Sequence, residues 1–467
     1  MKIKDILSQV RGFKYMIDQM EMYSPLGKSY LMHIEWSMNS TELMHEWSMM
    51  ERVLMIRSLE PKQLKSLHYL LMQLVDIKGS LKSLKDGQIL CDIDLYEVKK
   101  FALISEKIRQ EIQSIFLLEK SEVFPVDPKH ELIVFPSLNS VIDALDPDGQ
   151  RIAAFHVYDS YSPVLARMRK AFKAEKDALV KAELYAKMQE IENQVREEIS
   201  DTLRPFVEDL SEVLNTMAYL DVLLVKCEQA ATKDLHRPNL SLDETKYKGL
   251  FHPQIKDELV IKNKDFQCLD LTFKEEPNLI TGINMGGKTV VLRSLALAQY
   301  LCQFGFFVPA LEADIVLKED ILLSIDDGQN ELVGLSSFGA EMMQINTMLQ
   351  VIESKNVLLL IDELARTTNP AEGRSIVCGL VDLLNEKNIA SFITTHYDRI
   401  DVPCRRLRVK GFSENIKVDK AQDLEKFIDY SLVEETTNEV PHEAIRIAEM
   451  MGVDSKLLEK ARYYLNK

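Results

Sequence analysis

The stretch NLITGINMGGKTVVLRSLALAQYL, residues 278–301, decides the fold of this chain. Its centre, Gly282–Thr289, fits the pattern G-x-x-x-x-G-K-[ST] between an apolar strand-like run and a helical run. In such a loop the backbone N–H groups surround phosphates, the lysine contacts the β- and γ-phosphates, and the hydroxyl binds Mg²⁺. We therefore predict a site for ATP and Mg²⁺ formed by Gly282, Asn284, Met285, Gly286, Gly287, Lys288 and Thr289.

A second motif is an apolar run that ends in two acids. Val357–Ile361 is typical of a buried strand, and Asp362 and Glu363 follow it directly. A carboxylate at the carboxyl end of a parallel strand reaches the Mg²⁺ shell, and a neighbouring carboxylate activates the attacking water. We predict that Asp362 is the Mg²⁺ ligand beside Thr289 and that Glu363 is the general base.

A third strand-like run, SFITTH at residues 391–396, also ends in polar side chains. A lone histidine at a strand end is usually a structural residue. Beside the other two motifs, we instead expect His396 to contact the γ-phosphate or the attacking water.

The chain divides into a helical half and a half in which strands alternate with helices. Short apolar runs separated by helical segments are typical of a parallel-sheet α/β domain, and they occur at 279–281, 314–317, 357–361 and 391–394. We expect a helical domain at 1–245, an α/β domain at 246–411 and a C-terminal extension at 412–467.

Two long helices are predicted in the helical half. No Gly or Pro interrupts the chain between Pro163 and Pro205, and apolar residues recur there at helical spacing. This pattern predicts one helix of roughly 60 Å. A second helix at 206–231 should pack on the first, so that the pair forms an antiparallel arm or lever.

The C-terminal segment 442–466 predicts two short helices. Gly452 suits the position after the first helix, and Asp454 or Ser455 suits the N-cap of the second. We expect a structural or dimerising hairpin here rather than a DNA-reading helix-turn-helix.

The composition disfavours several classes of protein. Lys and Arg number 57 against 73 Asp and Glu, a net charge of −16, which opposes general DNA affinity but still allows one basic face. The six cysteines form no CxxC pair, so neither a zinc site nor a disulfide framework is indicated. The N-terminus lacks a signal-peptide pattern, and the uncharged stretch 294–311 contains Gln, Gly and Pro. We expect a cytoplasmic protein without a membrane span.

These motifs resemble the ATPase domain of the MutS family. The resemblance rests on TGINMGGKT, FFVPA, LLLIDELARTT and TTHYD, and on Leu335–Met342, which is similar to the family signature S-x-F-x-x-E-M. It continues diffusely through the helical half from about residue 24. The resemblance implies an ABC-type α/β P-loop ATPase domain preceded by an all-α core and lever domain.

The resemblance assigns further residues. His252 and Pro253 are similar to the His-Pro element before the family's adenine pocket, whose aromatic residue would fall near Val260. In the family, two subunits complete each other's nucleotide sites. Ser336 would therefore contact the γ-phosphate bound by the P-loop of the partner, and we expect a homodimer.

The chain departs from the family pattern in three ways. Leu364–Thr368 stands where the family usually shows I-G-R-G-T, so that two glycines are lost and the loop is stiffened. There is no room for an N-terminal mismatch-reading domain, and no β-rich DNA clamp interrupts the helix expected from Val164 to Arg204.

Two functions remain open from the sequence. The first is DNA binding linked to mismatch repair or to distorted DNA, with ATP binding and hydrolysis moving the lever helices. The second applies the same ATPase to a protein partner, for example the reactivation of a cobalamin-dependent aminomutase, because the outline is similar to that of short MutS-like reactivating ATPases. A scaffold that only binds nucleotide is disfavoured, since it would need neither Glu363 nor His396.

Overall fold

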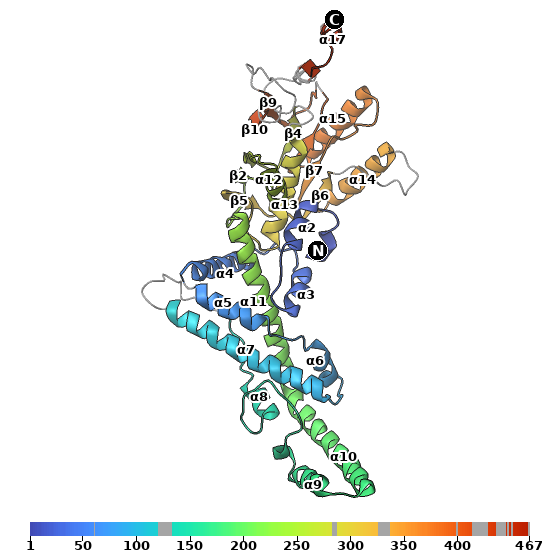
Figure 1. Cartoon of the computed structure of the whole chain (residues 1–467). Helices are drawn as coiled ribbons and strands as arrows, with labels where there is room; N and C mark the ends of the chain where they lie inside the picture. The colour runs from blue at the N-terminus through green and yellow to red at the C-terminus, as the bar shows by residue number, and fades with distance from the viewer. Residues whose placement is uncertain are drawn as a thin grey trace.

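The computed structural model describes the whole chain except residues 60, 120–132, 283–286, 326–336, 398–399, 413–427, 436–444, 446–447, 450–451 and 466–467. The molecule is elongated, with two β-sheets toward one end and a helical hairpin at the other (Figure 1).

The described residues before Asn239 fold into helices. In chain order these are α1 (Ile3–Ile6), α2 (Arg11–Asp18), α3 (Pro25–His33), α4 (Ser40–Leu59), α5 (Pro61–Leu71), α6 (Lys78–Lys85), α7 (Asp92–Glu119), α8 (Asn139–Leu145), α9 (Pro163–Ala174), α10 (Ala178–Leu203) and α11 (Val207–Lys233). Two short 3₁₀ turns, η1 (Asp159–Tyr161) and η2 (Arg204–Phe206), lie before α9 and between α10 and α11.

Helix α11 is the spine of this half. Its 27 residues span about 40 Å and pack against α3, α4, α5, α6 and α7. Most of its central residues are buried, from Met217 to Cys227, because helices surround it on several sides. The helix ends at Lys233 and is followed by Asp234, which adopts a left-handed conformation with φ +58°.

The prediction of a single helix between Pro163 and Pro205 is wrong, because the chain turns back at residues 175–177. Glu175 accepts hydrogen bonds from the amides of Lys176 and Asp177, and Asp177 accepts from the first amides of α10. Acidic side chains that bond the local backbone in this way compete with helix continuation and cap a new helix. Helices α9 and α10 therefore form a hairpin, hereafter the arm.

The expected antiparallel pairing of the two long helices is also wrong. Helix α11 extends onward from α10 instead of folding back on it, and α10 packs on α9 (Figure 1). The backbone at Leu203, Arg204 and Val207 stays in the right-handed helical region. Proline in the first turn of a helix costs little, because its missing N–H has no partner there anyway, so Pro205 does not force a reversal.

The strands and the remaining helices form the other end of the molecule. The strands are β1 (Asn239–Ser241), β2 (Thr245–Leu250), β3 (Leu269–Phe273), β4 (Pro277–Thr281), β5 (Glu312–Val316), β6 (Asp320–Ser324), β7 (Val357–Ile361), β8 (Ser391–Thr394), β9 (Arg405–Phe412) and β10 (Ile428–Glu434). The helices are α12 (Pro253–Ile261), α13 (Lys288–Gln303), α14 (Ser337–Ile352), α15 (Pro370–Glu386) and α17 (Ser455–Leu465). The strands with α12 to α15 are hereafter the head.

The head contains two sheets. The larger has the strand order β10-β9-β4-β8-β7-β6, and its strands are parallel except for β10. Three of the four apolar runs in the sequence are its central strands. The fourth run, expected in the same sheet, is β5 and belongs to the smaller sheet of order β1-β5-β2-β3. Its alternating burial suits a sheet with one covered face, whereas β4 and β7 are buried throughout.

Each face of the larger sheet is covered by its own core. Val357, Leu359 and Ile361 of β7 pack with residues of α14 and α15. Leu358 and Leu360 point to the opposite face and join a larger core that includes α13 and continues into the N-terminal helices. Because successive side chains of a strand alternate between faces, one apolar strand supplies both cores.

Helix α13 links the head to the spine. It begins at Lys288, and its last turn meets Lys226 of α11, whose Nζ lies 3.3 Å from the carbonyl oxygen of Phe304 and 3.2 Å from that of Gly305. The same ammonium pairs with Glu46 at 2.8 Å. A buried cation at a helix C-terminus is favoured by the helix dipole.

The C-terminal helix follows the predicted capping pattern. Gly452 has φ +76°, and Asp454 accepts hydrogen bonds from the amides of Lys456 and Leu457 at the start of α17. Most of the first of the two helices predicted at 442–466 lies outside the described residues. Among the helices that the structure describes, none is both long and apolar enough to cross a bilayer.

Candidate functional site

The two described glycines of the motif, before and after residues 283–286, have backbone conformations that favour glycine. Gly282 and Gly287 both have positive φ, at +126° and +75°, and Gly287 is the N-cap of the helix. A Cβ at residue 282 would lie 3.2 Å from the Cβ of Val409, so this position leaves little space for a side chain. Of the predicted loop residues, Asn284, Met285 and Gly286 lie outside the described residues and stay predictions.

The carboxyl ends of strands β7 and β8 meet the N-terminus of α13. The Thr289 hydroxyl of α13 donates to Asp362 Oδ2 at 2.5 Å, and the Thr394 hydroxyl of β8 donates to Asp362 Oδ1, also at 2.5 Å. The amide of Glu363 donates to Thr394 Oγ1 at 2.8 Å. Strands β4, β7 and β8 are parallel neighbours, so their carboxyl ends share one edge of the sheet.

Lys288 is buried between the loop and the acids. Its Nζ donates to the carbonyl oxygen of Gly282 at 2.9 Å and lies 3.9 Å from Glu363 Oε1. Burial lowers the pKa of Lys288, and the neighbouring carboxylates of Glu363 and Asp362 oppose that shift. A buried ammonium at the N-terminus of a helix is well placed to gain from a polyanionic ligand.

Glu363 stands at a strained point of the chain. Its φ is +49°, and Ala365 two residues later has φ +59°, although left-handed backbone is unfavourable for residues that carry a Cβ. Ala365 occupies one of the two places where the family usually has glycine. The Glu363 carboxylate is also held by Arg366, whose Nη1 lies 3.1 Å from Oε2.

Side chains from two other elements hold this loop. Glu341 of α14 accepts a hydrogen bond from the Ala365 amide at 3.0 Å, and the Tyr397 hydroxyl donates to the Ala365 carbonyl at 2.6 Å. Burial raises the pKa of Glu341. Glu341 belongs to the predicted signature, but Ser336 of the same motif lies outside the described residues.

The predicted histidines occupy different environments. His396 follows β8 and is exposed, with its ring centroid 4.4 Å from that of Tyr397. His252 is almost fully buried, and a Cβ at residue 12 of α2 would lie 2.5 Å from its Nε2. Burial, reinforced by Arg293, lowers the pKa of His252 to about 4. His252 therefore lies in the contact between the head and α2.

A cavity of about 610 Å³ opens beside the first turns of α13. Its lining is mainly apolar. It includes Leu259 of α12, Phe266 in the segment between α12 and β3, Gly287 at the N-cap of α13, Val290 of α13, and Tyr430 of β10. His252, the N-cap of α12, and Pro253, its first residue, are not part of the lining, and Val260 is 61% exposed. The aromatic residues beside this cavity are thus Phe266, six residues after Val260, and Tyr430, which is distant in sequence.

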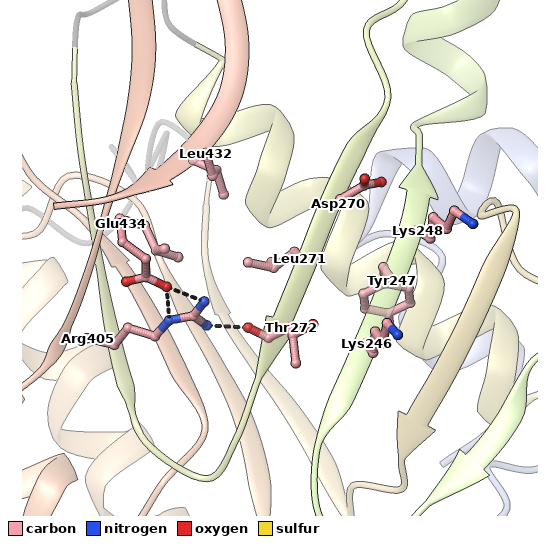
Figure 2. Close-up of a pocket in the computed structure, with 10 residues that line it drawn as sticks. Lys246, Tyr247, Lys248, Asp270, Leu271, Thr272, Arg405, Leu432 and Glu434 are labelled. Atoms are coloured by element: carbon pink, nitrogen blue, oxygen red, sulfur yellow. Dashed lines mark hydrogen bonds and ion pairs between the residues drawn. The ribbon is translucent and has the colours of Figure 1, made fainter.

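A smaller hollow of about 290 Å³ lies between the two sheets, where β3 faces β10. Figure 2 shows Arg405 lying between Glu434 and Thr272 there, with hydrogen bonds to the Glu434 carboxylate and the Thr272 carbonyl. The guanidinium also donates to Asn278 Oδ1 at 3.4 Å, so it is already occupied. None of the residues predicted from the motifs lines this hollow.

Sequence reasoning missed Thr394, Phe266, Tyr430 and the contact made by Glu341. Thr394 was visible as part of the polar end of SFITTH, and strand-end polar residues beside an acid-bearing strand are a usable signal. Tyr430 reaches the site only because β10 pairs with β9, which no local pattern encodes.

The donor set around Asp362 suits Mg²⁺. Thr289 and Asp362 offer oxygen ligands 2.5 Å apart, and Mg²⁺ commonly takes one or two protein oxygens together with phosphates and waters. Among the described residues, no group of three or more His, Cys, Asp or Glu side chains forms a metal site of its own. The cluster therefore fits a metal that arrives with a phosphate ligand.

Comparison with known proteins places this region in a recognised family. Residues 278–467 match the family described as MutS domain V. The chain is 31% identical over 300 residues to Endonuclease MutS2 of Fusobacterium nucleatum, an alignment that covers 60% of this chain and 36% of that protein. It is 32% identical over 215 residues to Endonuclease MutS2 of Ligilactobacillus salivarius, covering 44% and 26%.

A third relative carries a different description. The DNA mismatch repair protein MutS of Listeria innocua is 26% identical over 295 residues, covering 63% of this chain and 34% of that protein. The aligned part is thus well under half the length of each of these relatives.

Proposed function

Because the chain belongs to the MutS family, we propose that it is a Mg²⁺-dependent ATPase of the ABC type that works as a homodimer and moves its helical part when ATP binds and is hydrolysed. The observation that carries the proposal is the cluster of Thr289, Asp362, Thr394 and Glu363 beside Lys288 at the N-terminus of α13. In the nucleotide-bound protein, Lys288 exchanges its contact with Gly282 for the β- and γ-phosphates.

The cavity beside α13 is the proposed binding place for the adenine base of ATP. Its mainly apolar walls exclude water from a flat ring, and Tyr430 and Phe266 offer faces for stacking. Gly287 belongs to both the cavity and the glycine-rich loop. An ATP molecule whose adenine lies in the cavity therefore has its phosphates at the N-terminus of α13.

Thr289 and Asp362 would hold Mg²⁺, which neutralises charge on the phosphates when bound. Glu363 accepts a proton from the attacking water, since its carboxylate lies at the strand end beside Lys288. Its contact with Lys288 is lost when Lys288 turns to the phosphates, and its separate pairing with the exposed Arg366 must open as well. His396, exposed at the next strand end, contacts the γ-phosphate or the water.

The homodimer completes the site. Ser336 of one subunit contacts the γ-phosphate held by Asn284, Lys288 and Thr289 of the other. The exposed apolar side chains of α17, Leu457, Tyr463 and Tyr464, support a contact between copies at the C-terminal end. We also propose that the domain boundaries lie at residues 245 and 411.

Helix α13 offers a route from the nucleotide to the helical part. It starts at Lys288 and ends on Lys226 of the spine, about 24 Å away at 1.5 Å per residue. A shift of α13 on ATP binding therefore displaces α11 and, through it, the arm.

We propose DNA as the ligand of the moving part, in a process linked to mismatch repair or to the recognition of distorted DNA. Support comes from one part of the arm: residues 163–189, which are α9 and the first half of α10, carry seven Lys and Arg against three Asp and Glu, a net +4, whereas the whole arm, residues 163–203, carries eight of each. Lys170, Lys173 and Lys176 are exposed there. Such a basic surface suits phosphate contacts.

A protein client, such as a cobalamin-dependent aminomutase, is the second candidate. The observation that favours it is the exposure of apolar side chains on the arm, where Leu179 is 79% exposed and Tyr185 is 54% exposed. Phosphate contacts gain nothing from these side chains, whereas protein interfaces have apolar centres.

The test is steady-state ATPase activity with duplex, mismatched, four-way-junction and single-stranded DNA at low and at physiological salt. Stimulation by one structure that survives physiological salt supports the DNA function. Activity that ignores every DNA favours the protein client. Activity that is the same in Lys288→Ala as in the wild type would contradict the ATPase assignment itself.

A further inference from the structure

Thr394 is a buried residue whose hydroxyl makes hydrogen bonds to both predicted acidic residues. Its hydroxyl donates to Asp362 Oδ1 at 2.5 Å and accepts from the Glu363 amide at 2.8 Å. The residue is fully buried at the end of β8. A single hydroxyl therefore connects the predicted metal ligand to the backbone of the predicted base.

The geometry at Asp362 makes the contact selective. Oδ2 faces Thr289 and Oδ1 faces Thr394, so the carboxylate is held from two sides by two elements. Thr289 and Oδ2 are the pair that would bind Mg²⁺. The bond from Thr394 to Oδ1 leaves Oδ2 free for that ligand exchange while it keeps the carboxylate plane in place.

The geometry at Glu363 adds a second role. Its backbone lies in the left-handed region, with φ +49°, where a residue with a Cβ needs support from its surroundings. The bond from the Glu363 amide to Thr394 supplies that support at the residue itself. The direction of the Glu363 side chain depends on this backbone conformation.

We propose that Thr394 is a positioning residue for ATP hydrolysis, which fixes the Asp362 carboxylate for the metal and the Glu363 backbone for the base. This inference rests on the proposed ATPase function. Thr394 is fully buried and bonds the two acidic residues, so its loss should affect turnover and metal affinity much more than nucleotide binding.

The experiment compares Thr394→Val, Thr394→Ser and Ser391→Ala in the full chain. Valine keeps the size and removes the hydroxyl, while serine keeps the hydroxyl and removes the methyl. Ser391 is the matched control, because it is a buried hydroxyl on the same strand with no hydrogen-bond partner for its Oγ in the described part of the chain. The readouts are kcat, KM for ATP, the Mg²⁺ concentration at half-maximal rate, and binding of a fluorescent ATP analogue.

Thr394→Val should lower kcat by about 10- to 100-fold and raise the Mg²⁺ concentration needed, as expected for the loss of an outer-shell partner. KM for ATP should stay within about threefold. Thr394→Ser and Ser391→Ala should keep near wild-type kcat. If the valine variant does not fold, Thr394→Cys takes its place, since a thiol is only a weak donor.

Two results would overturn the inference: wild-type kcat in Thr394→Val, or an equal loss in Thr394→Ser and Thr394→Val. Failure of the proposed function is distinguished by the wild-type protein, which would then show no ATPase activity above that of Lys288→Ala.

Discussion

The site in the head is built from residues that are far apart in the sequence, whereas the arm is built from residues that are close in the sequence. Thr289, Asp362 and Thr394 lie 73 and 32 residues apart, yet their hydrogen bonds are 2.5 Å long and largely shielded from water. In the arm, α9 packs on α10, its neighbour in the sequence, and side chains such as Lys173 and Leu179 project into solvent. Fixed geometry suits chemistry, whereas an exposed and locally built hairpin suits contact with a partner.

The largest effect is expected at Glu363, the predicted general base. Glu363→Gln removes the proton acceptor but keeps the size of the side chain, so kcat should fall at least about 100-fold while ATP still binds. The measurement is single-turnover hydrolysis together with equilibrium binding of nucleotide. Glu372→Gln, an exposed acid in the first turn of α15, is the control and should match the wild type. Hydrolysis at the wild-type rate in Glu363→Gln would remove Glu363 from the mechanism.

The contact between the head and α2 should respond to acid. His252 is buried in its neutral form with a pKa of about 4, against about 6.5 in the unfolded chain. As the pH falls, the unfolded state therefore binds the proton before the folded state does. The free energy of unfolding is at its full value above pH 6.5 and decreases as the pH falls from 6.5 toward 4. The expected loss in the free energy of unfolding is about 2 kcal/mol by pH 5.

The measurement for His252 is urea unfolding at pH 7 and pH 5. His252→Gln cannot gain the proton, so its stability should depend less on pH than that of the wild type. His33→Gln, at an exposed position of α3, controls for the loss of a histidine. Equal pH dependence in the wild type and His252→Gln would show that this histidine is not buried as a neutral group.

The arm should affect ligand binding and leave the chemistry unchanged. Reversing Lys170, Lys173 and Lys176 to Glu should lower DNA affinity by at least about 10-fold at low salt and flatten its salt dependence, because each phosphate contact releases counterions. Basal ATPase activity should stay the same. The measurement is fluorescence anisotropy of labelled DNA across a salt series.

A control for the arm has the same change in net charge elsewhere. Lys62, Lys78 and Lys82, exposed on α5 and α6, are reversed to Glu together. If these changes weaken DNA binding equally, the effect comes from overall charge. If neither set matters, the arm is not a DNA contact and the exposed Leu179 and Tyr185 become the surface to test against a protein client.

The same contrast explains what could be predicted from the sequence. Strands β4, β7 and β8 and the acids after β7 were predictable, because an apolar run buried on both faces and a glycine-rich loop are local signals. The MutS family resemblance is confirmed by the match of residues 278–467. The roles assigned to Lys288, Asp362, Glu363 and His396 stay predictions.

The errors arose where the outcome depends on distant partners or on competing local bonds. Tyr430 reaches the cavity beside Gly287 through the pairing of β10 with β9, which the sequence around residue 430 does not reveal. The break at 175–177 was missed because Glu175 and Asp177 suit a helix by charge pattern, while their bonds to the backbone end it. Patterns of hydrophobicity do not report that competition.

The smallest effect is expected where the spine meets the head, at Asp234. This exposed residue follows the last turn of α11 with φ +58°, and its negative charge lies at the unfavourable end of the helix dipole. Asp234→Gly relieves both problems and should raise the free energy of unfolding by about 1 kcal/mol. Asp234→Asn removes the charge and tolerates the conformation, so it should gain less. Asp234→Ala removes the charge but keeps a Cβ in left-handed backbone, so it should gain least. Thermal melts that rank alanine at or above glycine would show that backbone conformation does not limit stability at this joint.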